Sequence, residues 1–418
     1  MKIKSLFATL FAAAIATPIL ACGPLPASAL HSLAERAVSP DPAVATNAIT
    51  LLRFQGPAGL QALFDAHDSL IRQHQADLNR ILPPKLSPKW QRLQTALDSV
   101  SAQRDCYASH LYWYTNLEAA KNAAHDARKP ILSLRLLGNL DEEYSCANSR
   151  FFRTTLYANT EVSQYLRDHF ILHWQSVRPV PRITIDFGDG RKIERTITGN
   201  SIHYVLDANG RPVDGLPGLY GPKAFLKALA DAEPIALKCA TLSDNDREDY
   251  LRKFHSDRYA TILQAWNQDM KALGSEEIPM LKSFQTADDT TWLQLARLHA
   301  SDSQLDASSI TLISTKYPTA KEAARMAVSK TAVENPLTSA LRNLQNSIAE
   351  DTVRNEYQLH SQIHEWFMNG TASSDLAKFN SLVYAKLFLT PDSDPWLGLV
   401  PANTITALDN NGLVQSSN

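Results

Sequence analysis

Apolar residues recur every three or four positions through the first hundred residues and again after residue 242, which is typical of amphipathic helices. Between these regions, short apolar runs alternate with helical segments. We therefore predict a protein of the α/β plus all-α class, with an α/β domain at residues 110–240 embedded between a helical cap at 30–109 and a helical domain at 241–390. Residues 391–418 are predicted to form an extended C-terminal segment pinned by Trp396.

The central region carries the clearest element signals. A buried strand is predicted at 131–137 and a second at 170–177. The sequence Gly188-Asp189-Gly190 predicts a hairpin after the second strand and before the strands that follow. The predicted order is helix 117–128, strand 131–137, helices 146–157 and 161–169, strand 170–177, hairpin 182–187 and 191–197, strands 202–206 and 211–216, and helix 222–232. The flanking helices are predicted at 43–52, 59–74, 89–101, 244–272, 292–300, 319–331, 335–346, 352–368 and 374–389.

The first 29 residues have the layout of a secretory signal. Lys2 and Lys4 precede an apolar stretch that is too short and too interrupted for a membrane-spanning helix. Two cleavage sites compete: Cys22 ends a sequence that resembles a lipobox and would then be lipidated, whereas Ala27-Ser28-Ala29 fits an ordinary signal peptidase. Either route predicts an exported protein of a bacterial cell envelope, in the periplasm or anchored to a membrane by lipid.

Composition and net charge indicate which kinds of molecule the protein binds. The chain has 418 residues, 44% of them hydrophobic, and a formal net charge of −2. This composition is that of a globular protein with a sizeable core, and it lacks the basic surface that nucleic-acid binding requires. We therefore expect a partner protein in the envelope and no nucleic acid.

The mature chain keeps three cysteines, Cys106, Cys146 and Cys239, beyond the lipobox. An even subset of cysteines tends to pair in an oxidising compartment. A disulfide between Cys106 and Cys239 would leave Cys146 free, and a disulfide between Cys106 and Cys146 is the rival pairing. The third alternative is that all three thiols are reduced and buried.

Cys146 lies where the strand at 131–137 leads into a helix, so backbone N–H groups and Arg150 would stabilise its thiolate. The residue three positions later is Ser149, so no dithiol can form within the motif; its hydroxyl is expected to bond the sulfur. Asn200 and Ser201 lie on the loop expected to approach Cys146. They are candidates for orienting a substrate, or alternatively are turn and strand-start residues.

Residues 113–232 resemble the thioredoxin-like superfamily. The resemblance rests on Trp113, on Lys129-Pro130-Ile131-Leu132 and on Val205-Leu206-Asp207-Ala208-Asn209-Gly210, in that order. It implies a thioredoxin-like fold, in which Ser149 and Ser201 replace the second cysteine and the cis-proline of the family. The sequence around Cys146 is also distantly similar to the thiol/selenol motif of selenoprotein N, with Ala147 at the selenocysteine position.

Two functions follow as expectations. The first is an atypical single-cysteine redox or thiol-sensing protein, resembling a thiol-disulfide oxidoreductase, that acts on another envelope protein through Cys146. The alternative is a non-catalytic envelope scaffold or binding protein that reuses a thioredoxin-like fold. No cofactor is expected in either case.

One further pattern lies in the predicted helix at 352–368. Glu356, His360 and His364 recur at four-residue spacing, so they share one helix face, and histidines at this spacing can hold Zn²⁺. No further cluster in the sequence completes a site, so we expect a packed or solvated helix face and no metal.

Overall fold

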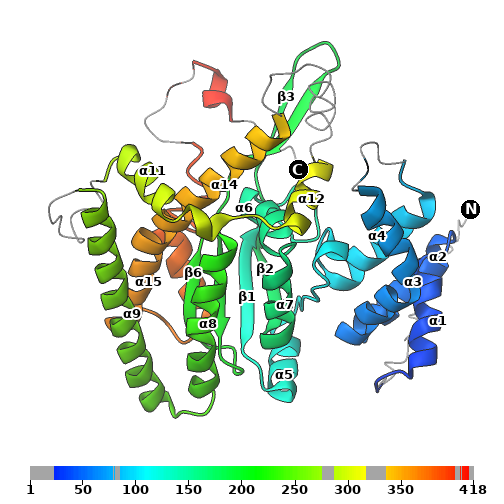
Figure 1. Ribbon diagram of the computed structural model, residues 1–418, viewed down its shortest axis with the longest axis horizontal. Helices are drawn as coiled ribbons and strands as arrows, with labels where there is room; N and C mark the ends of the chain where they lie inside the picture. Colours follow the sequence, from blue (N-terminus) through cyan, green and yellow to red (C-terminus); the bar gives the residue numbers. More distant parts are fainter. Residues whose placement is uncertain are drawn as a thin grey trace, which may run out of the picture.

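The computed structural model describes residues 23–78, 80, 85–274, 287–316, 336–400, 405 and 407–413. The predicted signal segment with Cys22 and the predicted helix at 319–331 lie outside the described residues, apart from 23–29. Within the described part, the protein is a mixed α/β molecule in which helices dominate (Figure 1). The predicted combination of an α/β sheet with surrounding helices is confirmed at this level.

A four-stranded mixed sheet lies at the centre of the molecule. Its strands are β1 (Ile131–Leu137), β2 (Ile171–Arg178), β5 (Ser201–Leu206) and β6 (Pro212–Pro217). They lie in the order β2-β1-β5-β6, with β2 parallel to β1, β5 antiparallel to β1, and β6 antiparallel to β5. All seven residues of β1 are buried, because both of its neighbours are paired strands and both faces of the sheet are covered.

Helices from the central part of the chain cover this sheet. They are α5 (Leu117–Ala127), α6 (Ala147–Phe151) with the following π turn (Phe152–Leu156), α7 (Thr160–His169) and α8 (Pro222–Cys239). Helices α7 and α8 run side by side along the sheet (Figure 1). Asn116 and Asn159 begin α5 and α7 by accepting a backbone N–H with their side-chain oxygens.

The N-terminal helices form a separate apolar core. They are α1 (Ala27–Ala37), α2 (Pro42–Phe54), α3 (Pro57–Leu78) and α4 (Pro88–Ser101). Leucines and aromatic residues from these helices make up this core, together with Cys106. Asp41 and Ser87 cap α2 and α4, and each is followed by proline at the first helical position, where proline costs no hydrogen bond.

The C-terminal helices join the core of the sheet. They are α9 (Asp244–Ala272), α11 (Asp289–Leu298), α12 (Ala307–Lys316), α14 (Pro336–Arg354), the π turn Asn355–His360, α15 (Ser361–Met368), α16 (Leu376–Leu382) and the π turn Val383–Leu387. Ile363, Trp366 and Phe379 are buried in the same apolar cluster as β1 and β5. A smaller cluster joins α9, α11 and α14.

Two details of the predicted C-terminal part were wrong. Helix α12 was not predicted, because its short, serine-rich and threonine-rich sequence has weak periodicity. The predicted anchor Trp396 is 47% exposed, and the neighbouring Leu397 is the buried residue of this segment, at 7%. A tight turn around Asp394, whose carboxylate accepts the N–H groups of Trp396 and Gly398, turns Leu397 inward.

Candidate functional site

Cys146 is the N-cap residue of α6, directly after the loop that follows β1, as the sequence predicted. Its backbone N–H donates to the Leu137 carbonyl at 3.1 Å, which fixes the start of the helix against the end of the strand. The side chain is 0% exposed and belongs to the main apolar core. Burial, and then the nearby Cys146, raise the pKa of the Tyr157 and Tyr384 hydroxyls, so both tyrosines lie near the thiol.

Ser149 and Arg150, which were predicted to support Cys146, make their hydrogen bonds to groups other than its sulfur. The Ser149 hydroxyl donates to the Cys146 carbonyl oxygen at 2.9 Å, so the prediction that it bonds the sulfur was wrong. Serine often bonds a backbone carbonyl one turn earlier in a helix, which satisfies a buried hydroxyl locally. The Arg150 guanidinium donates to the Ser145 carbonyl at 2.9 Å and to the Thr196 hydroxyl. Arg150 therefore ties the motif to the hairpin.

The loop carrying Asn200 and Ser201 does approach the motif, but it contacts Asn148. The Asn148 amide donates to the Ser201 hydroxyl at 3.1 Å, and Ser201 is buried. The Asn200 amide donates to the Thr390 hydroxyl at 3.2 Å, so it holds the C-terminal segment. In this arrangement both residues use their side chains for internal packing.

Cys106 and Cys239 are free thiols, so the predicted disulfide between them is absent, and so is the rival disulfide between Cys106 and Cys146. The reason is that the cysteines belong to different cores: Cys106 lies in the N-terminal helical core, whereas Cys146 and Cys239 lie in the core of the sheet. All three are buried. This is the third alternative that the sequence left open.

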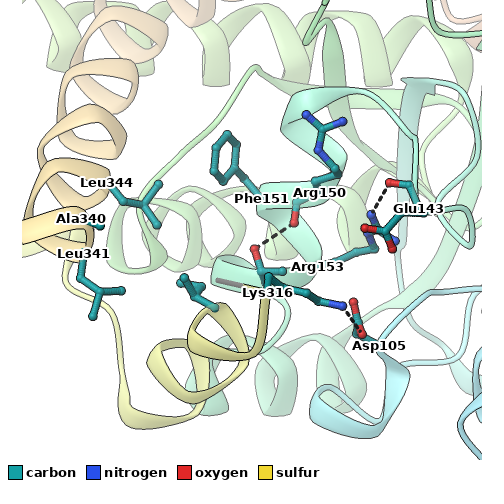
Figure 2. Close-up of a pocket in the computed structure, with 11 residues that line it drawn as sticks. Asp105, Glu143, Arg150, Phe151, Arg153, Lys316, Ala340, Leu341 and Leu344 are labelled. Carbon is teal, nitrogen blue, oxygen red and sulfur yellow. Dashed lines mark hydrogen bonds and ion pairs between the residues drawn. The ribbon is translucent and has the colours of Figure 1, made fainter. Parts of the chain in front are cut away.

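A cavity of about 320 Å³ lies beside the motif (Figure 2). One wall is apolar and comes from α6, α12 and α14, with Phe151, Leu341 and Leu344 among its residues. The opposite wall is charged. Figure 2 shows Asp105, Glu143 and Arg153 on this charged side and the leucines of α14 across from them. Cys146 does not line the cavity, whereas Arg150 and Phe151, only four and five residues later, do.

On the charged wall, the two carboxylates form ion pairs, whereas the arginines hydrogen-bond neutral oxygens. Asp105 pairs with Lys316 at 2.7 Å, and Glu143 pairs with Arg104 at 2.6 Å. Within the described part of the chain, the hydrogen bonds of Arg150 and Arg153 go to carbonyl and hydroxyl oxygens. Burial lowers the pKa of Arg153, while Asp105 and Glu143 raise it. The wall thus presents guanidinium groups whose bonding partners are neutral, next to an apolar surface.

A second surface is the hairpin β3 (Arg182–Asp186) and β4 (Lys192–Thr196), which projects from the body of the molecule (Figure 1). The predicted hairpin is confirmed, and it is a separate two-stranded sheet. Its exposed apolar side chains are Ile183, Ile185, Phe187, Ile193 and Ile197. Since Ile185 pairs with Ile193, and Ile183 is two residues from Ile185, these three isoleucines share one face of the ribbon.

The predicted shared face of Glu356 and His360 is confirmed, because the Glu356 carboxylate bonds the His360 ring at 2.9 Å. This face is packed, and the fold adds a partner that the sequence did not reveal: Asp214 of β6 bonds the other nitrogen of His360 at 3.0 Å.

The cavity residues Arg153 and Leu344 were not identified from the sequence. They carry no local signal, since each looks like an ordinary position of an amphipathic helix.

None of the helices formed by the described residues combines the length and the apolar character needed to cross a bilayer. No protein-family model, no curated protein and no solved structure matches this chain.

Proposed function

We propose that this protein is a non-catalytic binding protein of the bacterial cell envelope, in which a thioredoxin-like core presents the hairpin β3–β4 to a partner protein. The order along the chain, β1, helices, β2, then the antiparallel pair β5–β6 and α8, supports the thioredoxin-like core, because βαβ followed by a β-hairpin and a helix is the order of a thioredoxin-like fold. The envelope location rests on the signal-like sequence of residues 1–29.

The observation that carries the proposal is the exposed apolar face of the hairpin. Ile185 is 48% exposed and Phe187 is 53% exposed, on a ribbon that stands away from the core. A two-stranded ribbon buries little apolar surface by itself, and clustered exposed apolar side chains mark interaction surfaces. The partner therefore covers this face with apolar side chains.

The cavity beside the motif extends the same surface. Thr196 at the end of β4 bonds Arg150, which lines the cavity, so hairpin and cavity are linked through one side chain. A volume of about 320 Å³ is enough for a bulky side chain. Within the described residues, the hydrogen bonds of Arg150 go to neutral oxygens, which favours an acidic group of the partner next to Arg150. We expect the partner segment to carry a bulky apolar residue beside Asp or Glu.

Site-specific photo-crosslinking in the native host tests the proposal. A photoreactive residue in place of Ile185 should give a discrete crosslinked product, while the same residue in place of Thr184, on the opposite face of the strand, should give little. Cys146→Ser should leave the Ile185 product unchanged. Equal products from both positions, or none from Ile185, would contradict the proposal.

A second candidate function is the monothiol redox or sensing protein acting through Cys146. One observation favours it: Cys146 is the N-cap residue of α6, and a helix N-terminus attracts negative charge. It requires that the buried thiol be reached by a partner. Alkylation of the native protein, mapped by peptide analysis, decides between the two functions. Rapid modification of Cys146 supports thiol chemistry, whereas modification only after denaturation supports the binding protein.

A further inference from the structure

Three potential metal ligands meet in the interior where the C-terminal helices pack on the edge of the sheet. Asp214 comes from β6, His360 from the end of the π turn Asn355–His360, and His364 from α15. One ligand atom from each side chain lies within 4.8 Å of the others. Asp214 is 2% exposed, and both histidines are 0% exposed. This cluster is separate from the hairpin and from the cavity in Figure 2.

The hydrogen bonds determine which nitrogen of His364 is free. His255 on α9 contacts the Val213 carbonyl through Nε2 at 2.9 Å, and a carbonyl only accepts, so this nitrogen carries the proton. His255 is 0% exposed and, among the described residues, hydrogen-bonds no carboxylate; a buried unpaired charge is costly, so the ring is neutral and its Nδ1 is an acceptor. Nδ1 of His364 lies 2.7 Å from that acceptor and must donate to it.

His364 is thereby left with an unprotonated Nε2 atom. This atom is buried and, within the described residues, has no hydrogen-bond partner. A buried imidazole nitrogen with an unused lone pair is costly unless something fills the position. A metal ion would use this lone pair.

His360 has the support that metal-bound histidines usually have. Its Nδ1 is bonded by the Glu356 carboxylate at 2.9 Å, and its Nε2 lies 3.0 Å from the Asp214 carboxylate. A carboxylate on the far nitrogen fixes the ring and raises its basicity toward a metal. In this arrangement Glu356 supports the ring, while Asp214 and Nε2 of His360 face each other as two ligands.

We propose that Asp214, His360 and His364 bind one divalent transition metal ion, with Zn²⁺ as the best-matched ion. Two imidazoles and one carboxylate are a common set of three protein ligands for such ions. Binding replaces the proton that His360 shares with Asp214, and this proton is released to solvent. The ion would then join β6 to the helix formed by α14, the π turn and α15.

A second cavity of about 210 Å³, with Tyr220, Arg258 and Glu356 in its wall, lies on the Glu356 side of His360. Glu356 lines this cavity and bonds Nδ1 of His360, so Glu356 and the His360 ring separate the cavity from the metal position at Nε2. The Tyr220 ring lies 6.4 Å from the His360 ring, and its hydroxyl is buried with no partner among the described residues. The π turn that ends at His360 is a distortion often found at functional sites.

Zn²⁺ titration of the chelator-treated full-length mature protein, against a competing chromophoric chelator, tests the proposal. We expect one ion per chain. Asp214→Asn and His364→Gln should weaken Zn²⁺ binding about 100-fold or more, and Glu356→Gln, which removes only the supporting carboxylate, about 10–100-fold. The matched control is His299→Gln, because His299 lines the same cavity but lies outside the cluster.

Co²⁺ provides a readout that does not depend on the variants. In the wild-type protein it should give visible d–d bands without a thiolate-to-cobalt charge-transfer band. Failure of the wild-type protein to bind Zn²⁺, a thiolate band, or unchanged affinity in folded Asp214→Asn would overturn the proposal. If the ligand variants do not fold, the affinity of Glu356→Gln and the wild-type Co²⁺ spectrum decide.

Discussion

Burial controls the chemistry of individual residues in this protein. Burial raises the pKa of the Cys239 thiol to about 11 and raises that of Cys106 still further, so both remain protonated at neutral pH. His203, enclosed between β1 and β6, has its pKa lowered by burial to about 3 and is neutral. These side chains carry chemical groups that the sequence marks as reactive, yet their surroundings keep them in uncharged forms.

Asp98 gives a pH dependence that can be measured. Burial, and then the nearby charge of Asp105, raise the pKa of this carboxyl to about 7, against an ordinary value of 3.8. Because the folded state disfavours its ionised form, folding stability should fall as the pH rises from about 4 to about 7. Asp98→Asn retains an acceptor for the Cys106 N–H and cannot ionise. Above pH 7 the variant should therefore have a free energy of unfolding about 1–3 kcal/mol higher than that of the wild-type protein.

Urea unfolding at pH 5 and pH 8 checks this prediction. The Asp98→Asn protein should gain stability relative to wild type at pH 8 and much less at pH 5. Asp126→Asn, at an exposed position, is the control. An equal effect of Asp98→Asn at both pH values would show that ionisation of the Asp98 carboxyl does not lower the folding stability.

At the scale of elements, close backbone contacts fix how helices meet. Helices α2 and α3 are joined by a short turn, and a Cβ atom on Gly59 would lie only 1.9 Å from the Leu52 carbonyl oxygen of α2. The obstacle is backbone, which cannot rotate away as a side chain can. Glycine at this position therefore sets the distance between the two helices.

Gly59→Ala should destabilise the protein by about 1–3 kcal/mol, the usual cost of forcing extra atoms into a packed region. Chemical denaturation followed by circular dichroism measures the change. Gln61→Ala, two residues later at an exposed position of the same helix, should change stability by about 0.5 kcal/mol or less. A Gly59→Ala protein as stable as the control would mean that the helices separate without cost.

At the scale of the whole molecule, one core joins parts that are distant in the sequence. The C-terminal residues Trp366, Phe379 and Tyr384 are buried together with β1 and β5. Arg178 at the end of β2 donates to the carbonyls of Thr390 and Asp394, which holds the C-terminal segment against the sheet. The sheet and the C-terminal helices are thus expected to unfold together.

Phe379→Ala tests this shared core against a matched substitution at Phe54. Phe379 is 0% exposed, whereas Phe54 is 83% exposed. Removing the buried ring should cost about 3–5 kcal/mol and lower the temperature at which the sheet melts, while Phe54→Ala should change little. Separate melting of sheet and helices in the Phe379→Ala protein, seen by hydrogen exchange, would contradict a single cooperative unit.

Localisation is also a property of the whole chain. If Cys22 is lipidated, the wild-type protein should fractionate with membranes, and Cys22→Ser should move it to the soluble periplasmic fraction or block its processing. If Ala27-Ser28-Ala29 is cleaved instead, both proteins should be soluble in the periplasm, with the same mature N-terminus. Recovery of both from the cytoplasm would exclude export.

The local pattern of the sequence determined most of the elements. Strand β1 and helix α9 have the predicted bounds, because a strand buried on both faces reads as an apolar run and a long helix repeats its period many times. The hairpin and the helix start at Cys146 were also predictable, since turn and capping signals lie within a few residues of the structure that they specify.

Contacts between distant residues were decided only by the tertiary structure. Asp214 and His360 are 146 positions apart, and nothing local to either marks the other. Whether Cys106 pairs with Cys239 depends on which core encloses each, and whether Arg150 faces a thiol or a cavity depends on where the hairpin returns. Periodicity tells which side of an element is buried, but the identity of the neighbour on that side is fixed by how the elements pack.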